Sequence, residues 1–372
     1  MRSGYFRRYF RIKLFLAVAV LASCRSVLAA DVTADTTARF LAGLPVPGTP
    51  LESKTSDSSW IRHASEFDHE WEHFDKAQRA NIRDWAARAL GENFVNEEPL
   101  FYMFSGPDFL YANAFFPNAN TYILCGTELI GPVPEVEAMT AIELGSALAN
   151  LRRALDSSLN WSFFITKHMK ADLKQTRLSG TLPILYVFLA RAGCTIDSVT
   201  EVKLDEAGNF AEQSKRVTPG VKIIFTGSGG RKQTLYYFTT DLADWSVGTN
   251  PGFLKFCQQQ GRGASLLKAS SYLMHGNHFA RVRDFLLANS DLILQDDSGI
   301  PYRFFAPDQW SLQCYGRYLG PIGTFKQYPQ PDLAKAYAAT ESPPLNFSFG
   351  YQWHPSRSSL VVATPRVTVE SR

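Results

Sequence analysis

The sequence predicts a mixed α/β fold (α+β), with a helix-rich N-terminal half and a largely antiparallel C-terminal half. Residues 100–131 hold two short apolar runs, 100–104 and 121–125, bounded by Gly, Pro and Asn, which is typical of buried strands. Helical patterns surround this unit, whereas strand and turn patterns dominate after residue 194.

The composition indicates a globular protein. The chain has 372 residues, 45% of them hydrophobic, which is enough to bury a large core. The net charge of +3 is misleading, because residues 1–30 hold six basic residues and no acidic one. The rest of the chain carries 32 basic and 35 acidic residues, so we expect no nucleic-acid partner.

Residues 1–30 predict an export signal. A basic segment ends at Lys13, and the apolar residues 14–23 that follow are too few to span a bilayer. The small-residue pattern at 27–29 suits ordinary signal peptidase. Arg7-Arg8 resembles part of a twin-arginine signal, so both export routes remain open.

A second processing site competes with the first. Leu21-Ala22-Ser23-Cys24 resembles the lipobox of bacterial lipoproteins, which would remove residues 1–23 and leave a lipid-modified Cys24. We therefore expect a periplasmic protein or one anchored to the membrane by this lipid alone.

The mature chain divides into two predicted parts. Residues 31–59 are rich in Thr, Ser, Asp, Pro and Gly, which indicates a flexible tether. Residues 60–372 are predicted to form a single mixed α/β domain, with a division near residue 195 as the alternative.

Helices are predicted mainly in the first half of the chain. They cover 60–90, a long segment with apolar positions Leu144, Leu148, Leu151 and Leu155, then 160–178 and the buried 183–192, which is apolar nearly all round. A later helix is predicted over 278–287, with Asn277 as its N-cap.

Strands are predicted mainly in the second half. A first strand covers 199–204, and a hairpin joins 221–225 to 234–239 through Gly227–Gly230. A second hairpin is predicted from 292–294 to 302–305, and a last strand with alternating aromatic residues, 347–353, pairs with 360–363.

Four cysteines remain once Cys24 is cleaved off or lipidated. None belongs to a CxxC pair and each has apolar neighbours, so buried free thiols are favoured, although an oxidising compartment permits disulfides. They are Cys125, Cys194, Cys257 and Cys314.

The segment between the two central strands gives the best candidate site. It is long enough for a right-handed parallel crossover, with Pro107 at the first position of its helix. Parallel strands end at one edge of a sheet, which would bring together Ser105, Asp108, Thr127 and Glu128 as ligand-binding residues. We expect Asp108 to be exposed at these strand ends; the alternative is a capped helix in which Asp108 only favours the helix dipole.

His69 and His73 form a weaker metal candidate. The segment 69–73, HEWEH, matches the HExxH spacing of zinc proteases, with Glu97 or Glu98 as the nearby third ligand. Acidic residues crowd the same helix, which favours a solvated surface. We expect no bound metal and no other cofactor.

Three further patterns have structural alternatives. Ser265 and Lys268 fit the SxxK nucleophile pattern, but its partner motifs are missing. Gly227–Gly230 has the glycines of a phosphate cradle, but its strand-like flanks favour a hairpin turn. The aromatic residues of 347–353 suit carbohydrate stacking, but an aromatic strand face is usually core.

Two stretches carry a family resemblance. FYMFSGPDFLYANAFFP with TYILCG, and ILQDDSGIPYRFF over 293–305, resemble segments of uncharacterised exported bacterial proteins. The resemblance implies export and a common fold, and it carries no activity.

Two functions are consistent with these observations. The first is an exported cell-envelope protein that binds a ligand or an envelope protein without turning it over. The alternative is a hydrolase that uses the Ser105, Asp108 and Glu128 edge, or a metal at His69 and His73. The sequence shows no coherent set of nucleophile, base and orienting residue, which favours binding.

Overall fold

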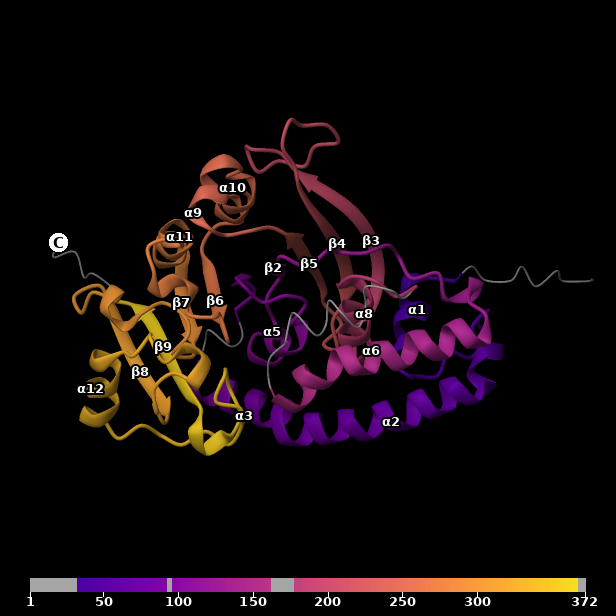
Figure 1. Ribbon diagram of the computed structural model, residues 1–372, viewed down its shortest axis with the longest axis horizontal. Coiled ribbons are helices and arrows are strands. Elements are labelled where there is room, and N and C mark those ends of the chain that lie inside the picture. The colour runs from indigo at the N-terminus through magenta and orange to yellow at the C-terminus, as the bar shows by residue number, and fades with distance from the viewer. Residues whose placement is uncertain (1–31, 92–95, 162–176, 367–372) are drawn as a thin grey trace, which may run out of the picture.

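The computed structural model describes residues 32–91, 96–161 and 177–366 (Figure 1). The predicted signal peptide, Cys24 and nearly all of the helix predicted over 160–178 lie outside the described residues. Within them, no helix is both long and apolar enough to cross a membrane.

The described residues form one nine-stranded sheet in the order β3-β4-β5-β2-β1-β6-β7-β9-β8. Its five central strands are parallel, and an antiparallel pair flanks them on each side. The mixed α/β fold with a largely antiparallel C-terminal half is therefore confirmed. The sheet also joins strands from both sides of residue 195, because β5 pairs with β2. The strands are β1 (Pro99–Tyr102), β2 (Thr121–Gly126), β3 (Thr195–Leu204), β4 (Thr218–Thr226), β5 (Lys232–Thr239), β6 (Gly263–Leu267), β7 (Ser290–Gln295), β8 (Trp310–Gly316) and β9 (Ser359–Pro365).

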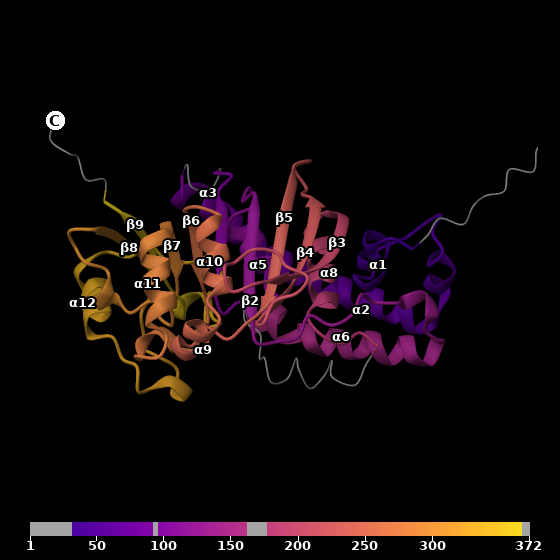
Figure 2. The same cartoon turned by 90° about the horizontal axis from the view of Figure 1, so that it is seen from above.

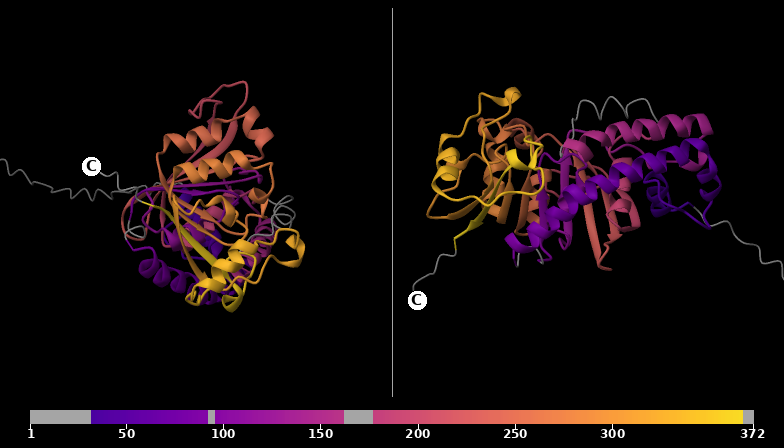
Figure 3. Two further views of the ribbon diagram at one scale, coloured as in Figure 1. Left: turned by 90° about the vertical axis from the view of Figure 1, so that its left-hand side faces the viewer. Right: turned by 90° about the horizontal axis from the view of Figure 1, so that it is seen from below.

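Helices cover both faces of the sheet, because alternate residues of its strands feed two separate apolar cores. In Figure 1, α9, α10 and α11 lie above the sheet, and α2 and α6 lie below it. Figure 3 shows α2 and α6 side by side across the lower face. The helices are α1 (Ala34–Leu41), α2 (Ser58–Phe74), α3 (Ala80–Ala89), α5 (Phe109–Phe115), α6 (Ala141–Trp161), α8 (Leu182–Arg191), α9 (Asp244–Thr249), α10 (Gly252–Gln259), α11 (Ala280–Asn289) and α12 (Pro331–Ala339).

The predicted strand–helix–strand unit is confirmed as β1–α5–β2. Its strands are parallel, with Leu100 opposite Tyr122. One detail differs from the prediction, because α5 begins later than expected. Asp108 is its N-cap and accepts a hydrogen bond from the Tyr111 amide, so Pro107 precedes the helix.

The prediction of a flexible tether is wrong for residues 32–59. This segment contains α1, and Phe40, Leu41 and Leu51 are fully buried in the core. The indole of Trp60 donates to the Phe40 carbonyl at 3.1 Å. A few large apolar side chains thus outweigh a polar composition, because their burial offsets the entropy of ordering the segment. Figure 2 shows α1 beside β3, at one end of the sheet.

The buried helix over 183–192, the long helix and the glycine hairpin are confirmed as α8, α6 and the β4–β5 turn. The second hairpin is wrong, because residues 302–304 form a single 3₁₀ turn and β7 pairs with β9. The aromatic strand over 347–353 is also wrong. Phe347 and Phe349 are buried, but this segment makes only an isolated bridge.

The N-cap predicted at Asn277 is not formed. Helix α11 begins at Ala280, and its first amides donate to the carboxylate of Asp244, at 3.0 Å from Ala280 and 2.8 Å from Arg281. A carboxylate from another element therefore caps this helix and favours its dipole. The four described cysteines are free thiols, as favoured from the sequence.

Candidate functional site

A cleft of about 370 Å³ lies at the carboxyl ends of the central strands. The loops after β1, β2, β5 and β6 line it, together with Phe279 and Tyr351. The chain passes from β1 to β2 on one side, whereas β6 and β7 lie on the other side of β1. Such a reversal of strand order is where open α/β sheets place ligands.

The structure brings the four predicted residues together. Ser105, Asp108, Thr127 and Glu128 all line this cleft, because β1 and β2 are parallel and end at the same edge. That they bind a ligand remains a prediction.

Asp108 is not the exposed charge that we expected. It is 2% exposed, and its Oδ2 lies 2.8 Å from Nζ of Lys268. The same oxygen accepts a hydrogen bond of 2.7 Å from the Tyr102 hydroxyl. The sequence of α5 gives no sign of this pairing, because Lys268 arrives on the loop after β6. Asp108 is thus part of a buried ionic cluster as well as a helix cap.

The sequence pattern placed Lys268 beside Ser265 in an SxxK motif, whereas the structure pairs it with Asp108 in the cleft. Its side chain is 1% exposed, and Nζ lies 3.4 Å from the ring centroid of Tyr111. Burial lowers the pKa of the Lys268 ammonium, and the charge of Asp108 opposes that shift. The only feature of the sequence that could have identified Lys268 as a site residue is its position directly after the buried strand β6.

The SxxK pattern is not a catalytic pair here. Ser265 lies within β6, with its hydroxyl 2.7 Å from that of Ser290, whereas Lys268 follows the strand and its Nζ contacts Asp108. A nucleophile and its base would have to face each other.

Glu128 also lines the cleft. The Tyr237 hydroxyl lies 3.2 Å from its Oε2, and Thr239 donates to its carbonyl at 2.7 Å. Burial raises the pKa of Tyr237, and the charge of Glu128 raises it further. A Cβ at Gly126 would lie 2.1 Å from Glu128 Oε2, so the glycine makes room for the carboxylate.

Ser105 connects the two central strands. Its hydroxyl accepts from the Cys125 amide at 3.2 Å and lies 2.8 Å from the Gly106 carbonyl, to which it donates. The neighbouring Cys125 thiol is fully buried, and burial raises its pKa to about 12. The thiol therefore stays protonated at neutral pH.

The loops around the cleft are strained. Among the described residues, four non-glycine residues have a positive φ, and all four follow β1 or β6: Phe104 at 60°, Ala269 at 52°, Ser271 at 53° and Tyr272 at 54°. Such conformations persist only where the surroundings hold them, and they are concentrated at functional sites.

Side chains from neighbouring segments hold the loop after β6. Asp296 Oδ2 accepts from the Ala269 amide at 3.1 Å, and Asp297 Oδ2 accepts from the Tyr272 hydroxyl at 2.5 Å. The Tyr351 hydroxyl donates to the Ala269 carbonyl at 2.8 Å. Burial and the adjacent Asp296 charge raise the pKa of Asp297 to about 7. Sequence analysis assigned both aspartates only to a hairpin turn.

The other predicted sites are not assembled as clusters. His69 and His73 are exposed on α2, and within the described residues no group of three or more His, Cys, Asp or Glu side chains could hold a metal ion. In comparisons with known proteins, no family model, curated protein or solved structure matched this chain.

Proposed function

We propose that this is an exported cell-envelope protein that binds a small cationic, donor-rich ligand in the strand-end cleft without turning it over. The charge of the described lining carries the proposal. It contains Asp108, Glu128 and Asp241 against a single cation, Lys268, which is paired with Asp108. With three carboxylates and one ammonium group, the described lining has a formal charge of −2, and ionised carboxylates only accept hydrogen bonds. A ligand with an amine and several hydroxyl groups, such as an amino sugar, meets this requirement.

The size and walls of the cleft fit such a ligand. A volume of about 370 Å³ is within the range of small-molecule sites. Phe104, Leu242, Leu273 and Phe279 supply apolar surface beside the polar groups. The strained loops hold this outline in place before any ligand enters, which lowers the entropic cost of binding.

Three observations favour binding over the hydrolase alternative. The Ser105 hydroxyl is engaged with the backbone between the two strands. The Cys125 thiol is held protonated by burial. The described lining contains no histidine to act as a base, and Asp108 is committed to Lys268 and Tyr102.

Binding is tested by the melting temperature of the mature protein with four probes: glucosamine, spermidine, glucose and gluconate. We expect glucosamine and spermidine to raise it in a saturable way and gluconate to leave it unchanged. Glu128→Gln and Asp241→Asn should each weaken binding about tenfold, the effect of one lost charged hydrogen bond. Glu72→Gln, on the exposed side of α2, is the control. Stabilisation by gluconate alone, or unchanged binding in both variants, would reject the proposal.

Export rests on residues 1–30 and has its own test. If Cys24 is lipidated, Cys24→Ala should release the protein from the membrane fraction into the soluble envelope fraction. An unmodified N-terminus at Ala30 or Asp31, measured by mass spectrometry, would show ordinary signal-peptidase cleavage instead.

A further inference from the structure

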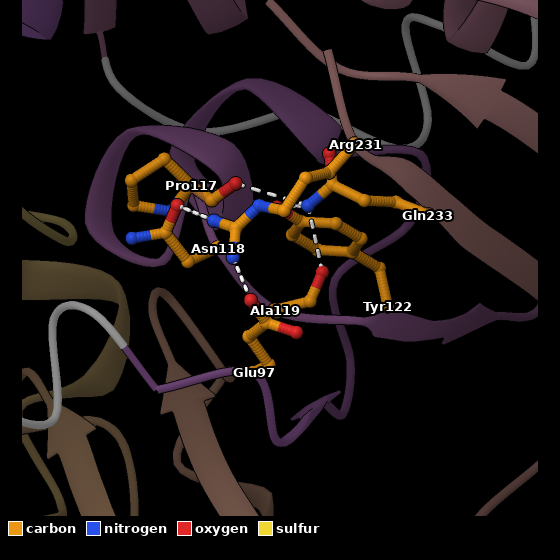
Figure 4. Close-up of polar contacts among 7 residues, drawn as sticks. All are labelled: Glu97, Pro117, Asn118, Ala119, Tyr122, Arg231 and Gln233. Carbon is orange, nitrogen blue, oxygen red and sulfur yellow. Dashed lines mark hydrogen bonds and ion pairs between the residues drawn. The ribbon is translucent and has the colours of Figure 1, made fainter. Parts of the chain in front are cut away.

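A second cavity, of about 210 Å³, lies near the amino ends of β2 and β5, at the other end of these strands from the cleft. Arg83 of α3 and Asn113 of α5 line one side, and the β4–β5 turn with Arg231 lines the other. Figure 4 shows Arg231 and Gln233 beside the segment 117–119. We propose that this cavity binds a small oxyanion of the phosphate or sulfate class.

The charge of the cavity points to an anion. Its described lining includes two guanidinium groups and no carboxylate. Arg231 is already neutralised by Glu97, which lies outside the lining, and it also donates to Asn118 (Figure 4). The charge of Arg83 has no such partner, since no described carboxylate lies within ion-pair distance of it.

Arg83 is also short of hydrogen-bond acceptors. Its Nη2 donates to Asn113 Oδ1 at 3.0 Å, whereas its buried Nε has no partner among the described residues. Its neighbour Arg79 is paired with Asp75 and adds no acceptor. A partly buried guanidinium with an unused donor is costly unless an acceptor fills the site. Arginine presents several donors in one plane, which matches the oxygens of phosphate or sulfate.

The wall opposite Arg83 is built rigidly. The Gln233 side-chain amide donates to the carbonyls of Pro117 at 3.0 Å and Ala119 at 2.7 Å (Figure 4). A Cβ at Gly227 would lie 2.3 Å from Gln233 Oε1, so a larger residue there would have to displace the Gln233 side-chain amide. These two hydrogen bonds hold Gln233 next to the turn Gly227–Gly230, whose glycines resemble a phosphate cradle. The turn is a hairpin, and Arg83 supplies a second guanidinium group beside it, in addition to Arg231.

The test is the melting temperature of the mature protein against inorganic phosphate, at constant ionic strength set with sodium chloride. We expect a saturable rise with phosphate, a similar rise with sulfate and none with chloride alone. Arg83→Gln should abolish the response. Arg88→Gln, which changes an exposed arginine on the same helix, should keep it.

A second pair of variants covers the case in which Arg83→Gln does not fold. A Cβ at Gly229 meets nothing within 4 Å, and its φ is not in the left-handed region, so a side chain is tolerated there. Gly229→Asp places a carboxylate at the cavity and should remove the phosphate response, whereas Gly229→Asn should keep it. A phosphate response that survives in both Arg83→Gln and Gly229→Asp, or no specific response in the wild type, would overturn the proposal.

Discussion

Replacing Asp108 by Asn should destabilise the fold strongly, because it removes one charge from a buried ion pair. Lys268 would keep its ammonium in a site where its side chain is 1% exposed, with its closest anion gone. The asparagine has one oxygen, so it can accept either from the Tyr102 hydroxyl or from the Tyr111 amide that caps α5, but not from both. The loss therefore combines the broken ion pair with one lost hydrogen bond.

The magnitude follows from the burial of the pair. Breaking a buried pair from one side costs about 3–5 kcal/mol. In a domain of this size, 1 kcal/mol moves the melting temperature by about 2 °C, so the expected drop is about 6–10 °C. An exposed Asp108 that acts only on the helix dipole would contribute about 0.3–1 kcal/mol, which is a drop of at most about 2 °C.

The assay is thermal unfolding at neutral pH of the wild type, Asp108→Asn, Lys268→Met and the double variant. The double variant should lose less than the two single variants together, because it leaves no unpaired charge. Asp241→Asn, a half-buried carboxylate in the same cleft, is the control and should lose about 1 kcal/mol or less. Small, additive losses in both single variants would refute the buried pair.

Four other predictions follow from buried groups and close contacts. Because the native pKa of Asp297 is raised to about 7, the wild type should lose stability relative to Asp297→Asn as the pH rises from about 4 to about 7. His63 acts in the opposite direction: burial lowers its pKa to about 4, so the wild type should lose stability relative to His63→Phe as the pH falls from about 6.5 to about 4. Melting curves across pH check both. Gly126→Ala should stay folded but displace the Glu128 carboxylate and weaken ligand binding. Gly263→Ala should instead destabilise the fold severely, because its Cβ would lie 2.1 Å from a backbone oxygen of β1.

Local patterns were sufficient to predict the centre of the fold. The apolar runs on either side of α5 identify β1 and β2, and the geometry of a parallel crossover then requires Ser105 and Glu128 to reach the same edge. This inference needs no long-range information, because both strands lie in one short segment of the chain.

The partners of these residues could not be predicted in the same way. Lys268 reaches Asp108 only because β6 pairs with β1, and no local pattern encodes which strand joins β1 from that side. The error at residues 32–59 has a related cause. Composition reports the average polarity of a segment, whereas its order depends on a few side chains, such as Phe40, finding a place in the core.

The four residues with left-handed backbone beside the cleft help to fix its shape, whereas other side chains determine which groups a ligand meets there. Each costs about 1–3 kcal/mol, so the protein gives up stability to keep the outline of the site fixed. The side chains that hold this outline, Asp296 and Asp297, are buried behind the loop, whereas Ser271 faces the cleft. Variation in the facing residues can therefore change which ligand is preferred while the same cavity is retained. A cleft supported in this way is a scaffold for new specificities, provided that the buried aspartates are left intact.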